Sequence, residues 1–138
     1  MARRFGPRFS RFASFRRATV DADGQVKSAP RREPGKMNAN EERYADHLTE
    51  RADVIEWHFE AMKLRLADGT FIEIDFMVFR SDWTMELHEV KAYWKNLERV
   101  HIEDDARVKL KWCQDKYPFP ILVMYLDPAL GQWKEHAL

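Results

Sequence analysis

The sequence predicts an α/β domain (α-β-β-β-α-β) in which a central mixed sheet is flanked by helices. Two stretches place apolar side chains at helical spacing, while shorter stretches alternate or run continuously apolar, as strands do. The order helix, three strands, helix, strand is typical of an α/β core. The predicted elements are a helix over about 40–52, strands over 54–66, 71–79 and 84–91, a helix over about 103–116, and strands over 121–126 and 132–137.

Charge is divided unevenly along a chain whose formal net charge is zero. Residues 1–36 hold ten Lys and Arg against three Asp and Glu, whereas residues 37–138 hold thirteen against twenty. A basic arm on an acidic body suggests a polyanion as partner. We therefore expect a basic flexible N-terminal arm over 1–36, whose Arg4, Arg8 and Arg11 bind DNA, and a folded domain over 37–138. An Arg-rich, acid-poor N-terminus is also typical of a mitochondrial transit peptide, and that alternative stays open.

Capping and turn residues delimit the first helix and the first strand. Asn40 is a suitable N-cap, and the helical pattern continues to about Ala52. Aromatic and aliphatic residues over 54–66 then predict a strand, which ends at a turn containing Asp68 and Gly69.

The second and third strands become acidic at one end. One face of each strand begins apolar and ends charged, because side chains alternate between the two faces. If the strands pair as a hairpin, a register that matches apolar with apolar residues also sets two carboxylates opposite each other. The matched pairs are Phe79 with Met85, Met77 with Leu87, and Asp75 with Glu89.

The facing carboxylates of Asp75 and Glu89 repel each other and require compensation. A divalent cation would compensate for this repulsion, because hard oxygen ligands of this kind suit Mg²⁺ or Mn²⁺. The same alternation is equally consistent with a sheet end exposed to solvent, where charged side chains cost little. From the pattern alone, both a metal site and a solvated sheet end stay open.

The second half of the domain combines a connection, a helix and a buried strand. Residues 92–102 show no regular pattern, and we expect an irregular connection there. The helix that follows ends before two prolines, and 121–126 is a continuous apolar run typical of a strand buried on both faces. The apolar stripe of the helix contains Ala106, Leu110, Cys113 and Tyr117.

The charged residues of the second and third strands form a recognisable motif. Asp75, followed on the next strand by Glu89-Val90-Lys91, resembles the signature of the PD-(D/E)XK nuclease superfamily. The resemblance implies a restriction-endonuclease-like core that hydrolyses DNA with Mg²⁺ or Mn²⁺ as cofactor. It implies that Asp75 and Glu89 bind the metal and that Val90 lends it a backbone carbonyl. It also implies that Lys91 orients or activates the attacking water.

Further segments resemble a family of small phage and prophage endonuclease-like proteins, mostly of unknown function, over about residues 36–126. This resemblance implies a phage- or prophage-encoded DNA endonuclease in the cytoplasm of the host cell. Branched DNA is one candidate substrate, and a homodimer is one candidate assembly. The matching segments are Lys36-Met37-Asn38, Glu41, Tyr44-Ala45, His47-Leu48, Lys63–Asp68, Asp75-Phe76, His88–Lys91, Asp104–Lys109 and Tyr117-Pro118-Phe119.

The chain departs from the family pattern at three places. Ile74 stands where proline is usual before the Asp, Ala92 stands where glycine is usual after Lys91, and residues 95–102 look like an insertion. None of these departures removes an expected catalytic group.

A carboxylate on the first helix is a further candidate for the site. Many members of the superfamily place a Glu of this helix beside the metal, and both Glu41 and Glu42 stand near its start. Glu41 shares a face with Tyr44 and Leu48, so periodicity and the resemblance both select it as a catalytic and metal-binding residue. Alternatively, both carboxylates only favour the positive end of the helix dipole.

Basic and aromatic side chains outside the motif are candidates for DNA contacts. Arg107, Lys109 and Lys111 on the second predicted helix would contact phosphate, although a solvated helix face explains them equally well. Trp94 would stack on a base, or it belongs to the core or the sheet edge, as the other tryptophans are expected to.

Composition excludes several classes of protein. No apolar run approaches the about 20 residues that a membrane span needs, so no membrane partner is expected. Cys113 is the single cysteine, which excludes an intramolecular disulfide and argues against a zinc site built from cysteines. A second hypothesis remains, a non-catalytic DNA-binding phage protein on a nuclease-like fold, because a fold alone does not confer activity.

Overall fold

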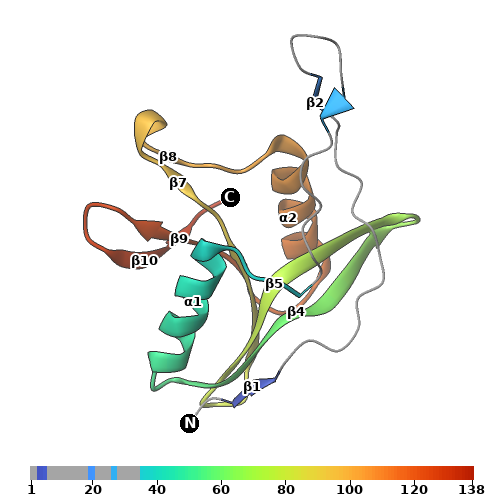
Figure 1. Ribbon diagram of the computed structural model, residues 1–138. Helices are drawn as coiled ribbons and strands as arrows, with labels where there is room; N and C mark the ends of the chain where they lie inside the picture. Colours follow the sequence, from blue (N-terminus) through green and yellow to red (C-terminus); the bar gives the residue numbers. More distant parts are fainter. Residues whose placement is uncertain (1–2, 6–18, 21–25, 28–34) are drawn as a thin grey trace.

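The chain folds around a six-stranded mixed sheet with two helices packed against it (Figure 1). The computed structural model describes residues 3–5, 19–20, 26–27 and 35–138. One pair of neighbouring strands at the first edge and one pair inside the sheet run parallel, and the other neighbours run antiparallel. The predicted α/β class with a mixed sheet is therefore confirmed. From one edge to the other, the strands are β1 (Arg3–Phe5), β4 (Val54–Ala67), β5 (Thr70–Arg80), β6 (Met85–Val90), β9 (Ile121–Asp127) and β10 (Gln132–His136).

Helix α1 (Ala39–Glu50) begins at a capping box. The Glu41 N–H donates to Asn38 Oδ1 at 3.0 Å, and the Asn38 N–H donates to the Glu41 carboxylate at 2.8 Å. The N-cap is therefore Asn38 and not Asn40 as predicted, because the reciprocal pair requires a Glu three residues after the cap. The helix ends at Glu50, two residues before the predicted end.

Each helix packs on its own hydrophobic cluster. Helix α2 (Asp104–Lys116) buries Leu110 and Cys113, the middle of the predicted apolar stripe. Neither helix of the part of the chain that the structure describes is long and apolar enough to cross a membrane. The α2 cluster includes Leu64, Leu66, Ile72, Ile74, Leu87, Ile121 and Val123, and the α1 cluster joins Tyr44, Ala45 and Leu48 to Trp57, Phe59, Phe76, Val78, Val90 and Met124.

The connection between β6 and α2 is more regular than predicted. Strands β7 (Tyr93–Trp94) and β8 (Arg99–Val100) pair as a small antiparallel hairpin around the 3-10 turn η1 (Lys95–Leu97). The His101 N–H donates to the Ala92 carbonyl at 2.8 Å and extends this pairing. The expectation of an irregular connection is therefore wrong, because strands of two residues are too short to leave a periodic pattern in the sequence.

Three short strands lie within the segment predicted as a basic arm, and the sequence did not predict them. Strand β1 runs parallel to β4 at the sheet edge, where Arg4 pairs with Trp57. Strands β2 (Thr19–Val20) and β3 (Val26–Lys27) form a separate two-stranded sheet. The remaining residues of the predicted arm up to position 34 lie outside the described residues.

Candidate functional site

The candidate site begins where the backbone pairing of β5 with β6 ends. The register is the predicted one, and its last pair is Phe76 with His88. One step further, the Asp75 N–H donates to Glu89 Oε2 at 3.3 Å, and the Val90 N–H donates to Asp75 Oδ2 at 2.8 Å. The two carboxylates therefore lie side by side on neighbouring strands, as the register predicts, and both are buried.

Lys91 lies against this carboxylate pair. Its Nζ donates to Glu89 Oε1 at 2.8 Å, and its N–H donates to the Met124 carbonyl at 2.9 Å. The parallel pairing of β6 with β9 reaches the same place, where Glu89 pairs with Val123 and Val90 with Met124. The backbone that carries Glu89 and Lys91 is therefore held from the β9 side.

Glu41 comes to the same place from helix α1. Its side chain is only 2% exposed, whereas Glu42 is exposed, so the predicted choice between the two helix carboxylates agrees with their burial. Helix α1 contacts β6, and the charge of Glu41 is among those that raise the pKa of Asp75. The structure thus brings together Glu41, Asp75, Glu89 and Lys91, the four residues predicted to be catalytic.

Burial and like charges dominate the electrostatics of the site. Burial raises the pKa of Asp75 well above its ordinary value, and the charges of Glu89 and Glu41 raise it further. The Val90 N–H and the Lys91 ammonium oppose this rise. Burial lowers the pKa of Lys91, but the charge and hydrogen bond of Glu89, together with the charges of Asp75 and Glu103, raise it, and its net shift is upward. The three carboxylates exceed the one lysine in charge, and a further cation would relieve that excess.

The residue types of this cluster fit a hard divalent cation. The carboxylates of Asp75, Glu89 and Glu41 and the carbonyl of Val90 are oxygen donors of the kind that Mg²⁺ and Mn²⁺ prefer. Among the described residues, however, no three His, Cys, Asp or Glu side chains are arranged to hold a metal ion. The hydrogen bonds explain this, because each carboxylate is turned to a protein donor. Metal binding would require these side chains to turn.

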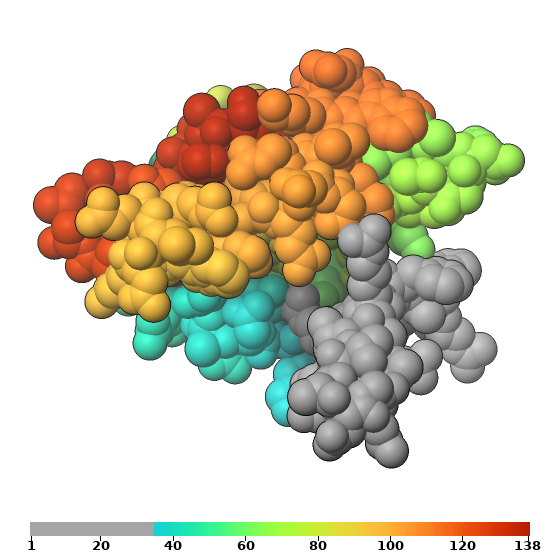
Figure 2. Space-filling view, turned by 90° about the horizontal axis from the view of Figure 1, so that it is seen from above, coloured from blue at the N-terminus to red at the C-terminus, as the bar shows by residue number. Residues whose placement is uncertain are grey.

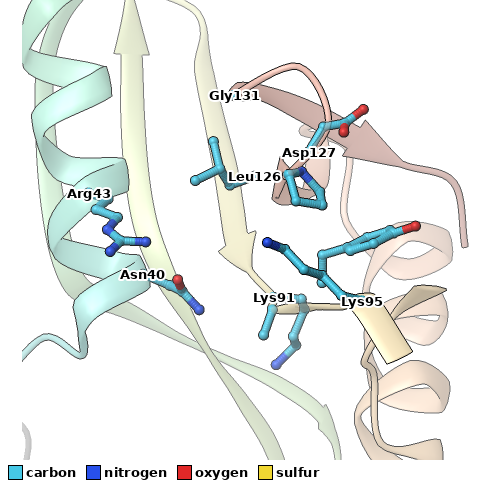
Figure 3. Close-up of a pocket in the computed structure, with 10 residues that line it drawn as sticks. Asn40, Arg43, Lys91, Lys95, Leu126, Asp127 and Gly131 are labelled. Atoms are coloured by element: carbon cyan, nitrogen blue, oxygen red, sulfur yellow. The ribbon is translucent and has the colours of Figure 1, made fainter. Parts of the chain in front are cut away.

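A cleft of about 310 Å³ opens beside Lys91 (Figure 3). Arg43 of α1 and Lys95 of η1 line it as well, and their cationic groups are complementary to a phosphate backbone, while the Lys91 ammonium is bonded to Glu89. Sequence reasoning missed Arg43 and Lys95, because periodicity identifies buried faces and says nothing of which exposed residues of different elements meet. The other lining residues are Asn40, Ala92, Tyr93, Leu126, Asp127, Pro128 and Gly131.

The remaining predicted DNA-binding residues are not at this cleft or are not described. Arg107, Lys109 and Lys111 lie on α2, and none of them lines the cleft. Arg4 lies in β1, which is separated from β6 by β4 and β5. Arg8 and Arg11 lie outside the described residues.

A buried chain of polar contacts connects α1 to β6. The Tyr44 hydroxyl and His88 Nδ1 lie 2.6 Å apart, and His88 Nε2 lies 2.8 Å from Glu86 Oε2. Burial raises the pKa of the Tyr44 hydroxyl, and the hydrogen bond from His88 lowers the pKa of Glu86. Tyr44 lies one helical turn after Glu41, and His88 directly precedes Glu89, so these contacts position the two carboxylates relative to each other.

Comparison of the chain with protein-family models, with curated proteins and with solved structures finds no match.

Proposed function

We propose that this protein is a metal-dependent DNA endonuclease with a restriction-endonuclease-like core, which hydrolyses phosphodiester bonds with Mg²⁺ or Mn²⁺. One observation carries the proposal: Asp75 and Glu89 are buried side by side, with Lys91 bonded to Glu89. Burying two like charges together is costly, so a role for the pair is expected. Holding a metal ion for phosphate chemistry is such a role. The Lys91 ammonium beside the pair supplies a further positive charge for that chemistry.

The proposed roles follow from the groups present. Asp75, Glu89 and Glu41 would hold the metal through their carboxylates, and Val90 through its carbonyl. When bound, Mg²⁺ supplies a water of lowered pKa and offsets negative charge on the phosphate. Lys91 is charged at neutral pH, since its pKa is raised. Its ammonium can therefore donate to the attacking water or to a phosphate oxygen and hold either in place.

The cleft beside the cluster is the proposed path of the DNA backbone. Arg43 and Lys95 provide cationic donors along it, and Lys91, whose ammonium is bonded to Glu89, lies between it and the carboxylates. Asp127, which also lines it, accepts from Lys134 at 2.7 Å and is thus paired with a cation of its own. Because residues 37–138 are acidic as a whole, DNA would depend on this local group of cations and on the basic residues of segment 1–36.

The test is cleavage of branched, single-stranded and duplex DNA in Mg²⁺, Mn²⁺, Ca²⁺ or EDTA. We expect cutting only with Mg²⁺ or Mn²⁺, because the reaction needs a water activated in a tight metal shell. Lys91→Gln should lower the rate by roughly 100-fold or more. Lys63→Gln, which changes an exposed lysine outside the cleft, should leave the rate unchanged. Undiminished cutting in EDTA, after trace metal is removed, would refute the mechanism.

A second candidate is a non-catalytic DNA-binding phage protein on the same fold. The observation that favours it is the internal bonding of the carboxylates, which leaves no three of the described acidic, His or Cys side chains converging on one point. Under this candidate, the protein binds DNA but cuts none of the substrates with any metal. Metal-dependent cutting that is lost in Asp75→Asn would exclude it.

A further inference from the structure

The β7–β8 hairpin has one face packed on the domain and one face turned outward. Tyr93 pairs with Val100, and Trp94 pairs with Arg99. Val100 is buried, and Tyr93 stacks on Tyr125 with ring centroids 5.8 Å apart, so these two residues define the inner face. Successive side chains alternate between faces, so Trp94 and Arg99 share the outer face.

On this outer face, Trp94 lies flat against His101. The two ring centroids are 3.7 Å apart and the ring planes are inclined by only 6°. Trp94 is still 43% exposed, so part of the indole beside His101 remains open to a ligand. The His101 N–H donates to the Ala92 carbonyl at the base of the hairpin, and this bond fixes the backbone that carries the His101 ring.

The Trp94–His101 stack stands at the border of the candidate site. Trp94 follows Lys91 by three residues, a reach of about 10 Å along the chain. Lys95, the next residue, lines the cleft together with Lys91, and an open hollow of about 350 Å³ is lined by Tyr93, Trp94, Lys95 and Asn96. Figure 2 shows the β7–β8 segment in gold at the surface, between α1 in teal and the β9–β10 hairpin in red.

We propose that the Trp94–His101 stack binds an unpaired base of the DNA strand whose phosphates lie in the cleft. The inference rests on the proposed function and adds the substrate class, DNA with an unpaired nucleotide beside the phosphate that is cut. In a continuous duplex every base is stacked on both sides, whereas an unpaired base offers a free ring face to an aromatic side chain. Arg99, which pairs with Trp94 across the hairpin, and Lys95, the next residue along the chain, are placed to contact the phosphates of that strand.

The experiment compares two single-stranded oligonucleotides that differ only in their bases. One is an ordinary strand, and the other carries abasic residues, so its phosphates are retained. Affinities of the full-length protein are measured by fluorescence anisotropy in Ca²⁺ to prevent cutting. We expect the ordinary strand to bind at least roughly fivefold more tightly, the lower end of what one stacked base contributes.

Variants of Trp94 then test whether the stack causes this affinity ratio, that of the ordinary strand to the abasic strand. Trp94→Ala should abolish the ratio and leave the affinity for the abasic strand unchanged, while Trp94→Phe should retain most of it. Trp83→Ala is the matched control, because Trp83 is the most exposed tryptophan at 71% and lies in the turn between β5 and β6. It should keep the wild-type ratio.

The outcomes separate this proposal from the nuclease itself. Equal affinity of the wild type for both strands overturns it, as does a ratio retained by Trp94→Leu, which keeps apolar bulk without a ring. The Leu and Phe variants decide the matter if circular dichroism shows that Trp94→Ala is unfolded. A ratio that depends on Trp94 in a protein that cuts no DNA supports the stack and refutes the nuclease, and cutting without such a ratio does the reverse. Absence of binding to either strand also overturns the stack, and the cleavage of duplex and branched DNA then decides the nuclease by itself.

Discussion

Asp75 and Glu89 accept main-chain hydrogen bonds across the end of the β5–β6 pairing, the first from the Val90 N–H at 2.8 Å and the second from the Asp75 N–H at 3.3 Å. These two side-chain hydrogen bonds continue the contact between β5 and β6 beyond the last backbone pair. In this arrangement they stabilise the end of the sheet, and the same oxygens are the proposed metal ligands. Sheet closure and metal binding would therefore compete for one pair of side chains.

Asp75→Asn is expected to stabilise the metal-free protein at neutral pH. Burial, with the charges of Glu89 and Glu41, raises the pKa of Asp75 above its ordinary value of 3.8, so folding favours the protonated form. This contribution to stability is present below pH 3.8 and is lost as the pH rises through the raised pKa. Asn is neutral at every pH and still accepts the Val90 N–H. Urea unfolding at pH 7 should therefore show a gain of about 1–2 kcal/mol in the free energy of unfolding.

A pH series provides the control for this substitution. The difference between wild type and Asp75→Asn should shrink as the pH falls toward the ordinary pKa of an aspartate. Asp68→Asn, which changes an exposed side chain after β4, should follow the wild type at every pH. Saturating Mg²⁺ should raise the melting temperature of the wild type and not that of Asp75→Asn. A variant less stable than the wild type at pH 7 would contradict the account of Asp75.

Glu41→Gln is expected to reduce cleavage while leaving the helix cap intact. A glutamine at this position can still accept the Asn38 N–H, as capping boxes allow, and it removes one of the charges that repel Asp75, so the protein should not be destabilised. The charge facing Asp75 is removed, so cleavage should fall by at least roughly tenfold and its dependence on Mg²⁺ should weaken. Glu42→Gln is the matched control and should leave both unchanged, because Glu42 is exposed. If Glu42→Gln were the inactive variant, the site would not include Glu41.

Tyr44→Phe is expected to cost about 1–3 kcal/mol in the free energy of unfolding, because it leaves His88 Nδ1 buried without its partner. Tyr117→Phe also removes a hydroxyl hydrogen bond, to the Arg65 carbonyl at 2.6 Å, but at an exposed place. Its cost should be smaller, since water replaces the missing partner. Thermal denaturation of the two variants measures this difference, and equal costs would show that the Tyr44–His88 hydrogen bond contributes no more than an exposed one.

Replacing Arg8 and Arg11 together by Gln is expected to flatten the salt dependence of DNA binding. Each cation that neutralises a phosphate releases counterions, so the slope of log affinity against log salt should fall by about 0.9 for each phosphate that is no longer neutralised. Arg65→Gln, an exposed change on the β4–β5 hairpin, should leave the slope as it is. The measurement is a salt titration of duplex binding. An unchanged slope in the double variant would show that this segment serves something other than DNA.

The pairing of β5 with β6 could be predicted from the sequence because one face of each strand is apolar over most of its length. A slip of one residue would move all these side chains to the other face, so only one register keeps apolar residues together. That register set Asp75 opposite Glu89. Helical periodicity separated Glu41 from Glu42 for the same reason, since it too reports which side of an element is buried.

Tertiary structure alone decided which exposed residues meet. Arg43, Lys91 and Lys95 reach one cleft from α1, from the end of β6 and from η1, and no pattern within any of these segments records the others. Trp94 and His101 likewise meet because a two-residue pairing folds the chain back between them. Burial is encoded locally, as a repeat of apolar side chains along one element. The approach of polar side chains from different elements depends on how those elements pack, and this is why the sequence predicted the carboxylates of the candidate site but not the cations that border it.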